Sequence, residues 1–156
     1  MSFVFIGLGF MAFFAATTLA VDVGMMMTAR TQAQTSADSG ALAGAVALAL
    51  NNYDDRSASG PAVQSAISSA QKNAVMSNAV SIGPADVTFP LSPGGAADRV
   101  HVTVYRTGGR TNPVGTLIGP LFGVPTVDIV AAATAQAAPA NAMTCVKPFI
   151  IPDRWT

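Results

Sequence analysis

The sequence is poor in the side chains that carry most protein chemistry. It has no glutamate, one histidine and one cysteine, and its charged content is 10%, against roughly 25% in an average soluble protein. A single cysteine excludes an internal disulfide framework and a cysteine-built metal site. The basic residues are dispersed and the formal net charge is zero. No basic stripe is available for nucleic acid, so we expect no nucleic-acid partner.

The few reactive side chains have no partner at a recognisable spacing. His101 is predicted on the polar side of a strand, with no nucleophile or carboxylate placed to act with it. Asp55, Ser57 and Ser59 match the D-x-S-x-S spacing by which von Willebrand A-type domains hold a divalent ion. No apolar strand precedes them, so a helix-capping turn is the favoured interpretation. Cys145 is interpreted as a buried thiol, with an intermolecular bridge or a partner in an unseen chain segment as alternatives.

No phosphate-binding glycine motif and no cluster of metal ligands is found either. We therefore predict no catalytic residue, no metal and no cofactor, and we do not expect an enzyme.

What the sequence does have is a long apolar start. Residues 1–21 contain no charged side chain, and as a helix they span roughly the 30 Å hydrocarbon layer of a bilayer. Their large apolar side chains point in all directions, as is typical of a helix in lipid or in a filament core. A signal peptide has a shorter apolar run preceded by basic residues. Earlier removal of a basic leader, which would make Met1 a processed N-terminus, would explain the missing positive charges.

The helix is predicted to continue without a break to residue 50. Residues 28–50 contain no proline, and the first turn signal is the polar cluster 51–55. Residues 1–50 are thus predicted to form one helix, with a membrane or filament-core span at 1–21 (the apolar span) and an alanine-rich packing rod at 22–50.

Small residues recur along this rod. Side chains of this size let two helix backbones approach closely. High helix propensity of alanine is the alternative explanation, but nearby leucine and valine side chains add apolar surface that favours packing. The predicted helix-packing interface, called the small-residue stripe, consists of Ala29, Ala33, Ala37, Gly40, Ala41, Gly44, Ala45 and Ala49.

Asp22 follows the apolar span directly. A carboxylate at the end of a membrane span is costly unless it lies at the interface or has a partner. The favoured interpretation is that Asp22 marks the water boundary. The alternative is that it pairs with the N-terminal amine of a neighbour in an assembly.

Residues 51–156 are predicted to form a small α+β domain outside the membrane. A helix is expected over 61–79, because Pro61 suits a first helical position and apolar residues follow at helical spacing. Strands are expected at 80–82, 86–89, 99–106 and 126–138, the last antiparallel to 99–106. The glycine-broken apolar segment 114–124 is expected to be a short helix or hydrophobic loop. The proline-punctuated tail 143–156 carries apolar side chains that need a surface.

The N-terminal residues also resemble a known family. The runs LAVDVG at 19–24, AR at 29–30 and QAQTSADSGALAGA at 32–45 resemble the start of TadE/TadG-like proteins of the Tad (Flp) pilus system. A later motif around Cys145 is similar to one that recurs in some members. Two features differ: there is no von Willebrand A domain, and Phe5 stands where major pilins have glutamate.

This resemblance implies a structural or assembly component of a Tad/Flp pilus or pilin-like filament, with a pilin-like N-terminal helix. The implied partners are copies of the chain or other pilin-like subunits, met through that helix, and membrane lipid before assembly. The implied location is the inner membrane, single-pass, with the C-terminal domain in the periplasm, or outside the cell within a pilus. The alternative function is a membrane-anchored periplasmic binding module of a secretion system.

Overall fold

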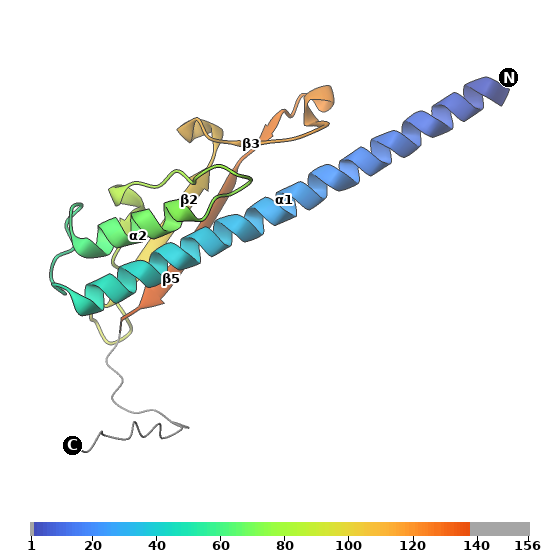
Figure 1. Ribbon diagram of the computed structural model, residues 1–156. Helices are drawn as coiled ribbons and strands as arrows, with labels where there is room; N and C mark the ends of the chain where they lie inside the picture. The colour runs from blue at the N-terminus through green and yellow to red at the C-terminus, as the bar shows by residue number, and fades with distance from the viewer. Residues whose placement is uncertain (1, 138–156) are drawn as a thin grey trace, which may run out of the picture.

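A single long helix runs through the molecule. The computed structural model describes residues 2–137, and helix α1 covers Ser2–Leu50 without a break. Its N-terminal half extends away from the rest of the chain, and its C-terminal half lies along the domain (Figure 1). The prediction of one continuous helix is confirmed for these residues.

The domain combines a second helix with short antiparallel sheets. The further elements are α2 (Pro61–Lys72), η1 (Pro84–Asp86), β1 (Val87–Thr88), β2 (Arg99–Arg106), η2 (Gly108–Arg110), β3 (Val114–Gly115), η3 (Gly119–Phe122), β4 (Thr126–Val127) and β5 (Ile129–Gln136). Three strands form one sheet in the order β1-β2-β5, and β3 pairs with β4. The α+β class is confirmed. The tail after residue 137, with Cys145 and the segment 143–156, lies outside the described residues.

The central strand pair is the one predicted. β2 and β5 are antiparallel along their whole length, from Arg99 opposite Gln136 to Arg106 opposite Ile129. The valines of β2 are fully buried while the residues between them are partly exposed, as alternation in a half-buried strand requires.

The other predicted strands are shorter. The last one is interrupted at Asp128, whose Oδ1 accepts the N–H of Gly108 at 2.7 Å. Residues 126–127 therefore pair with β3 instead of continuing β5. The predicted strand at 80–82 is reduced to one bridge between Ser81 and Tyr105.

Helix α2 ends seven residues before the predicted position 79. Met76 and Ser77 have left-handed backbone angles, with φ of 49° and 65°, which a right-handed helix cannot contain. Tertiary bonds hold this turn: Gln32 of α1 accepts the N–H of Met76 at 2.8 Å. The prediction of a helix over 73–79 is wrong because a contact with a distant residue outweighs local helix preference.

A buried arginine holds two loops against the sheet. Arg106 is 3% exposed, and its guanidinium donates to the carbonyls of Val75, Asn78, Asn112 and Pro113. Burial lowers the pKa of Arg106. Within residues 2–137 its charge is thus stabilised by backbone carbonyl dipoles and not by a carboxylate.

One core joins the C-terminal half of α1, α2 and the sheet. It includes Ala29, Ala37 and Leu48 of α1, three alanines of α2 and the valines of β2. The core therefore draws on residues on both sides of the predicted division at residue 51. The two helices approach closely: a Cβ placed on Gly44 would lie 2.8 Å from a methyl carbon of Val100 and 3.1 Å from the Cβ of Ala66.

Gly44→Ala is expected to destabilise the fold. The added methyl overpacks a contact between two helices and a β-branched side chain, which typically costs about 1–3 kcal/mol, partly offset by about 1 kcal/mol of helix propensity. Chemical denaturation of the full-length protein in detergent micelles, followed by circular dichroism, measures the change.

Gly24→Ala is the matched control, because a Cβ at Gly24 meets no atom within 4 Å. It is expected to leave the denaturation midpoint unchanged or raise it slightly. Equal effects of the two substitutions would contradict the close helix contact at Gly44.

An ion pair ties η1 to η2. Both terminal nitrogens of Arg110 donate to the carboxylate of Asp86, each at 2.6 Å, and Asp86 also accepts the N–H of Gly83. The bonds from Arg110 are the main reason that the pKa of Asp86 is lowered. A carboxyl whose pKa falls on folding stabilises the fold above its unfolded pKa of about 4, and this contribution is lost as the pH falls through the folded pKa.

Asp86→Asn is therefore expected to lower the denaturation midpoint at pH 7, with the difference from the unmodified protein shrinking as the pH falls below the unfolded pKa of about 4. Denaturation of both proteins across this pH range tests it. Asp54→Asn is the control, because Asp54 is largely exposed and lies 4.0 Å from its arginine. A constant difference for Asp86→Asn at all pH values would show that the ion pair is not its cause.

Candidate functional site

The side chains that could act in catalysis or bind a metal do not come together in the described part of the structure. Among residues 2–137, no three His, Cys, Asp or Glu side chains gather as metal ligands would. His101 lies on the outer face of β2, where its Nδ1 is 2.8 Å from the hydroxyl of Thr134 and its Nε2 is 3.3 Å from that of Thr103. These are hydrogen bonds across and along a sheet surface.

The D-x-S-x-S residues form a turn. Asp55 accepts the backbone N–H and the hydroxyl of Ser57, at 3.1 and 2.6 Å, and these bonds lower the pKa of Asp55. The turn precedes α2, but the residue at the N-cap is Gly60, with no side-chain cap. The motif thus shapes the loop before the helix, and the prediction that it caps the helix is wrong.

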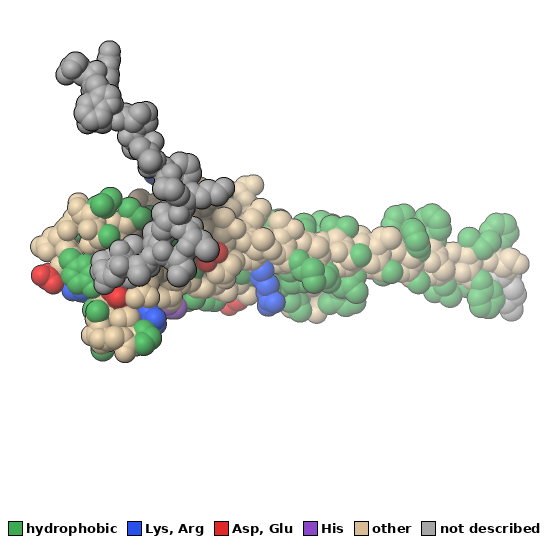
Figure 2. All heavy atoms as spheres, turned by 90° about the horizontal axis from the view of Figure 1, so that it is seen from below, with side chains coloured by type: hydrophobic (Ala, Val, Ile, Leu, Met, Phe, Trp, Pro, Cys, Tyr) green, Lys and Arg blue, Asp and Glu red, His purple; other side chains and the backbone are tan. Residues whose placement is uncertain are grey.

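The largest unpartnered feature is the N-terminal half of α1. Large apolar side chains project from it in all directions, and its most apolar stretch has no buried residue. Figure 2 shows these apolar side chains along the part of the helix that extends beyond the domain. The helix is long and apolar enough to cross a membrane, which is consistent with membrane anchoring. The exposed set includes Phe3, Phe5, Ile6, Leu8, Phe10, Met11, Phe13, Phe14 and Leu19.

The small-residue stripe is placed against the chain's own domain. Seven of its eight members are buried, and Ala49 is exposed. A Cβ on Gly40 would lie 3.0 Å from the carbonyl oxygen of Ala66 and 3.1 Å from Ala70, so α2 occupies the surface predicted for other helices. In this conformation the stripe leaves no room for a sister helix. Contact between copies through α1 stays a prediction, and the exposed surfaces open to it are the apolar half and the side of the helix that carries Leu42 and Val46.

Asp22 has partners that the sequence did not indicate. It is 4% exposed, and its two carboxylate oxygens accept the backbone N–H groups of Leu117 and Ile118 at 2.7 and 2.9 Å. The carboxylate thus has partners within the chain, and its place at the water boundary of the span stays a prediction. The glycines and proline of 114–124 do indicate a loop with free amides, but no sequence rule connects that loop to a residue more than 90 positions earlier.

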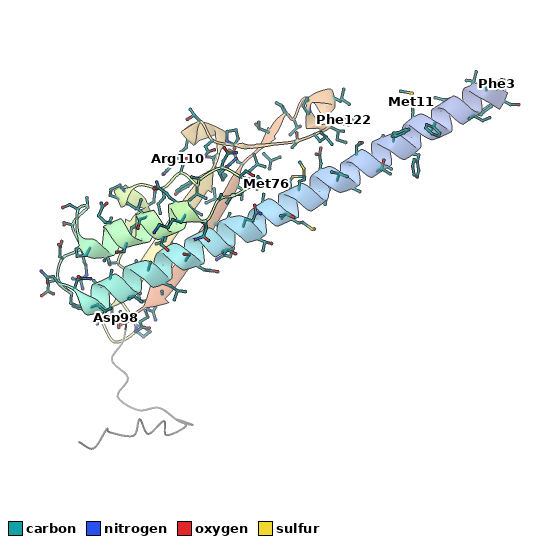
Figure 3. All side chains as sticks on the ribbon, in the orientation of Figure 1. Phe3, Met11, Met76, Asp98, Arg110 and Phe122 are labelled. Atoms are coloured by element: carbon teal, nitrogen blue, oxygen red, sulfur yellow. The ribbon has the colours of Figure 1, made fainter. Side chains whose placement is uncertain are left out.

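These bonds fasten one hairpin to the helix. The hairpin consists of residues 114–127, with β3, η3 and β4, and it lies alongside α1 at the junction between the domain and the apolar half (Figures 1 and 3). The site that the structure assembles is therefore an apolar helix surface bordered by an apolar hairpin, with one buried carboxylate joining them.

Comparison with known proteins finds a similarity over the long helix. Residues 2–47 match the Tad family model, described as "Putative Flp pilus-assembly TadE/G-like". The resemblance seen in the sequence is thereby confirmed for this segment, which supports a role in Tad pilus assembly and interaction with other pilus components, and suggests a structural role more than a catalytic one. No curated protein and no solved structure matches the chain.

Asp22→Ala is expected to release the hairpin from α1. The amides of Leu117 and Ile118 lose charged acceptors, and hydrogen bonds of that kind are among the stronger ones in proteins. Their hydrogen exchange, measured by NMR or mass spectrometry in micelles, should become at least about tenfold faster.

Asp22→Asn keeps one acceptor oxygen, so its amide exchange rates should fall between those of the unmodified protein and those of Asp22→Ala. Asp38→Ala is the control, since Asp38 is exposed on the same helix and bonds only to Gln34 among the described contacts. Unchanged protection of both amides in Asp22→Ala would refute the role of this carboxylate.

Proposed function

We propose that this chain, which is TadE/G-like over its long helix, is a structural or assembly component of a Tad/Flp pilus or pilin-like filament that assembles through the apolar half of α1. The observation that carries the proposal is the division of this helix. Residues 29–48 contribute to the core of the domain, whereas every described residue before Asp22 is exposed except Thr18, which is half-buried. The domain thus holds a free apolar helix that needs lipid or protein around it.

The two possible surroundings suggest a sequence of events. Lipid covers the apolar span before assembly, and other helices replace the lipid afterwards. Because lipid tails are as apolar as leucine, helix association in a membrane depends on close van der Waals contact, which small residues allow.

Small residues are available on the free half. Gly7 and Gly9 have open space where a Cβ would lie, unlike Gly40 and Gly44, whose surroundings are filled by the domain. Gly7 and Gly9 are therefore positions within the apolar span at which a second helix can approach closely. In this proposal the domain faces the periplasm, or the filament surface after assembly.

The binding-module alternative also has a specific observation in its favour. An open apolar groove lies between α1 and β5, lined by Leu42, Val46 and Ala49 of the helix and by Ala133 and Ala135 of the strand. Leu42 and Val46 are exposed there. If the protein is a binding module, this groove receives the ligand and the apolar span is only an anchor.

The assembly proposal predicts that Gly7→Leu and Gly9→Leu each block filament formation while membrane insertion continues. Leucine suits lipid but keeps a second helix away. The measurements are electron microscopy of pili and membrane fractionation, in cells that carry the complete pilus system and this variant as their sole copy. Leu8→Met is the matched control, because it keeps the volume at the neighbouring position.

Replacing each of residues 3–21 by leucine distinguishes an assembly component from a binding module. An assembly component loses its pili with this generic span, whereas a binding module keeps its function with any adequate anchor. Normal pili with the leucine span and with both glycine variants would overturn the assembly proposal.

A further inference from the structure

The end of the hairpin exposes apolar side chains that neither the core nor the helix contact uses. Leu121 is 83% exposed and Phe122 is 73% exposed, and Leu117 and Val124 beside them are exposed as well. No residue between Arg110 and Asp128 is charged. A cluster of large apolar side chains without charge marks a surface that meets lipid or another protein.

The hairpin end lies at the depth of the apolar span. Ile118 and Phe122 border an apolar hollow together with Ala15, Ala16 and Leu19 of α1. Ala15 precedes Asp22 by seven residues, which corresponds to about 10 Å along a helix. Figure 3 shows Phe122 at the end of the hairpin, on the side of the domain from which the apolar half of α1 extends. The hairpin thus reaches past the charged boundary of the span.

The backbone of the hairpin is prepared for surroundings without water. Its amides bond internally: Leu121 donates to Ile118, Gly123 to Pro120, and Val124 to Gly119. Thr116 donates through its amide to Pro125 and through its hydroxyl to Val124. The amides of Leu117 and Ile118 donate to Asp22 of α1. Unpaired backbone groups are what excludes irregular segments from lipid, and each of the N–H groups named here has an acceptor.

We infer that the hairpin end inserts into the membrane leaflet next to the domain, with lipid acyl chains seated between Leu121 and the apolar half of α1. The inference rests on the membrane anchoring proposed above. The groove has apolar walls on both sides, formed by Phe10, Phe14 and Ala15 of the helix and by Ile118 and Leu121 of the hairpin. A depth of about 10 Å is the range in which interfacial segments bury their apolar side chains.

Lipid is favoured over a second copy of the chain as the occupant of this groove, because the hairpin surface is continuous with the apolar span. The hairpin surface and the span form one apolar region, so any bilayer that covers the span to Asp22 also covers Phe122. The hairpin then acts as a second point of attachment, which holds the domain against the membrane surface and limits the tilt of the helix.

Depth-dependent fluorescence quenching tests the inference. The protein has one tryptophan, so Phe122→Trp and Leu121→Trp are each made in a Trp155→Phe background. The full chain is reconstituted in phosphatidylcholine and phosphatidylglycerol vesicles that contain phosphatidylcholine brominated near the headgroup or at mid-chain. We expect the hairpin tryptophans to lose at least about half of their emission, more strongly with the shallow bromines.

Two controls bracket the result. Phe10→Trp reports on the span and should be quenched best by mid-chain bromines, whereas Leu91→Trp, at an exposed apolar residue in another loop of the domain, should be unaffected. Quenching of Phe10→Trp without quenching of either hairpin variant overturns the inference and leaves the anchoring intact. Absence of quenching in all variants overturns both. A blue-shifted hairpin emission that bromine does not quench, and that fades when protein is diluted in lipid, identifies a second copy as the occupant and also overturns it.

Discussion

The structure depends on the close approach of α1 to α2 and to the central strand pair. Gly40 and Gly44 bring the backbone of α1 near Ala66, Ala70 and the valines of β2, so that the helix lies in the core and not merely beside it. Packing at this distance relies on many van der Waals contacts between small groups, and each added methyl would meet a neighbour. The helix and domain are consequently one body, and the apolar half has a defined direction relative to the domain.

This rigid connection fixes the position of the hairpin relative to the apolar span. If α1 were hinged near its middle, a hairpin beside it would have no fixed depth relative to the span. Because residues 29–48 are fixed in the core, Asp22 stays within reach of Leu117 and Ile118, and the carboxylate fastens the hairpin to the helix. A charge that is costly near lipid is thereby balanced by backbone amides that would also be costly there. The carboxylate of Asp22 and the amides of Leu117 and Ile118 thus satisfy each other's hydrogen-bonding needs.

The same arrangement separates two kinds of helix surface that look alike by composition. The buried half and the free half of α1 are both rich in small and apolar residues. The buried half faces the domain through the small-residue stripe, and the free half carries large side chains in all directions with Gly7 and Gly9 among them. The proposed assembly contact would use the free half, while seven residues of the stripe are buried within the chain's own domain.

Local rules were enough for the long helix, the apolar span, the strand over 99–106 and its pairing with the last strand. Each of these follows from periodicity along the chain or from alternation across a strand. The family resemblance rested on short runs within α1, which the family model also matches. The prediction of a helix over 73–79 was wrong because it considered local preference only, whereas the N–H of Met76 donates to Gln32 of a different element.

Tertiary structure alone decided the partners. A stripe of small residues indicates that another segment packs closely against the helix. It does not indicate whether this segment belongs to a sister helix or to the chain's own domain, since both offer the same van der Waals contact. Likewise, Asp22 and the apolar hairpin are far apart in the sequence, and no periodic pattern joins a carboxylate to two amides across that distance. The sequence by itself determined that the small-residue stripe must pack closely, and only the fold showed that the chain's own domain packs there, because contact between distant segments depends on how the whole chain folds around its core.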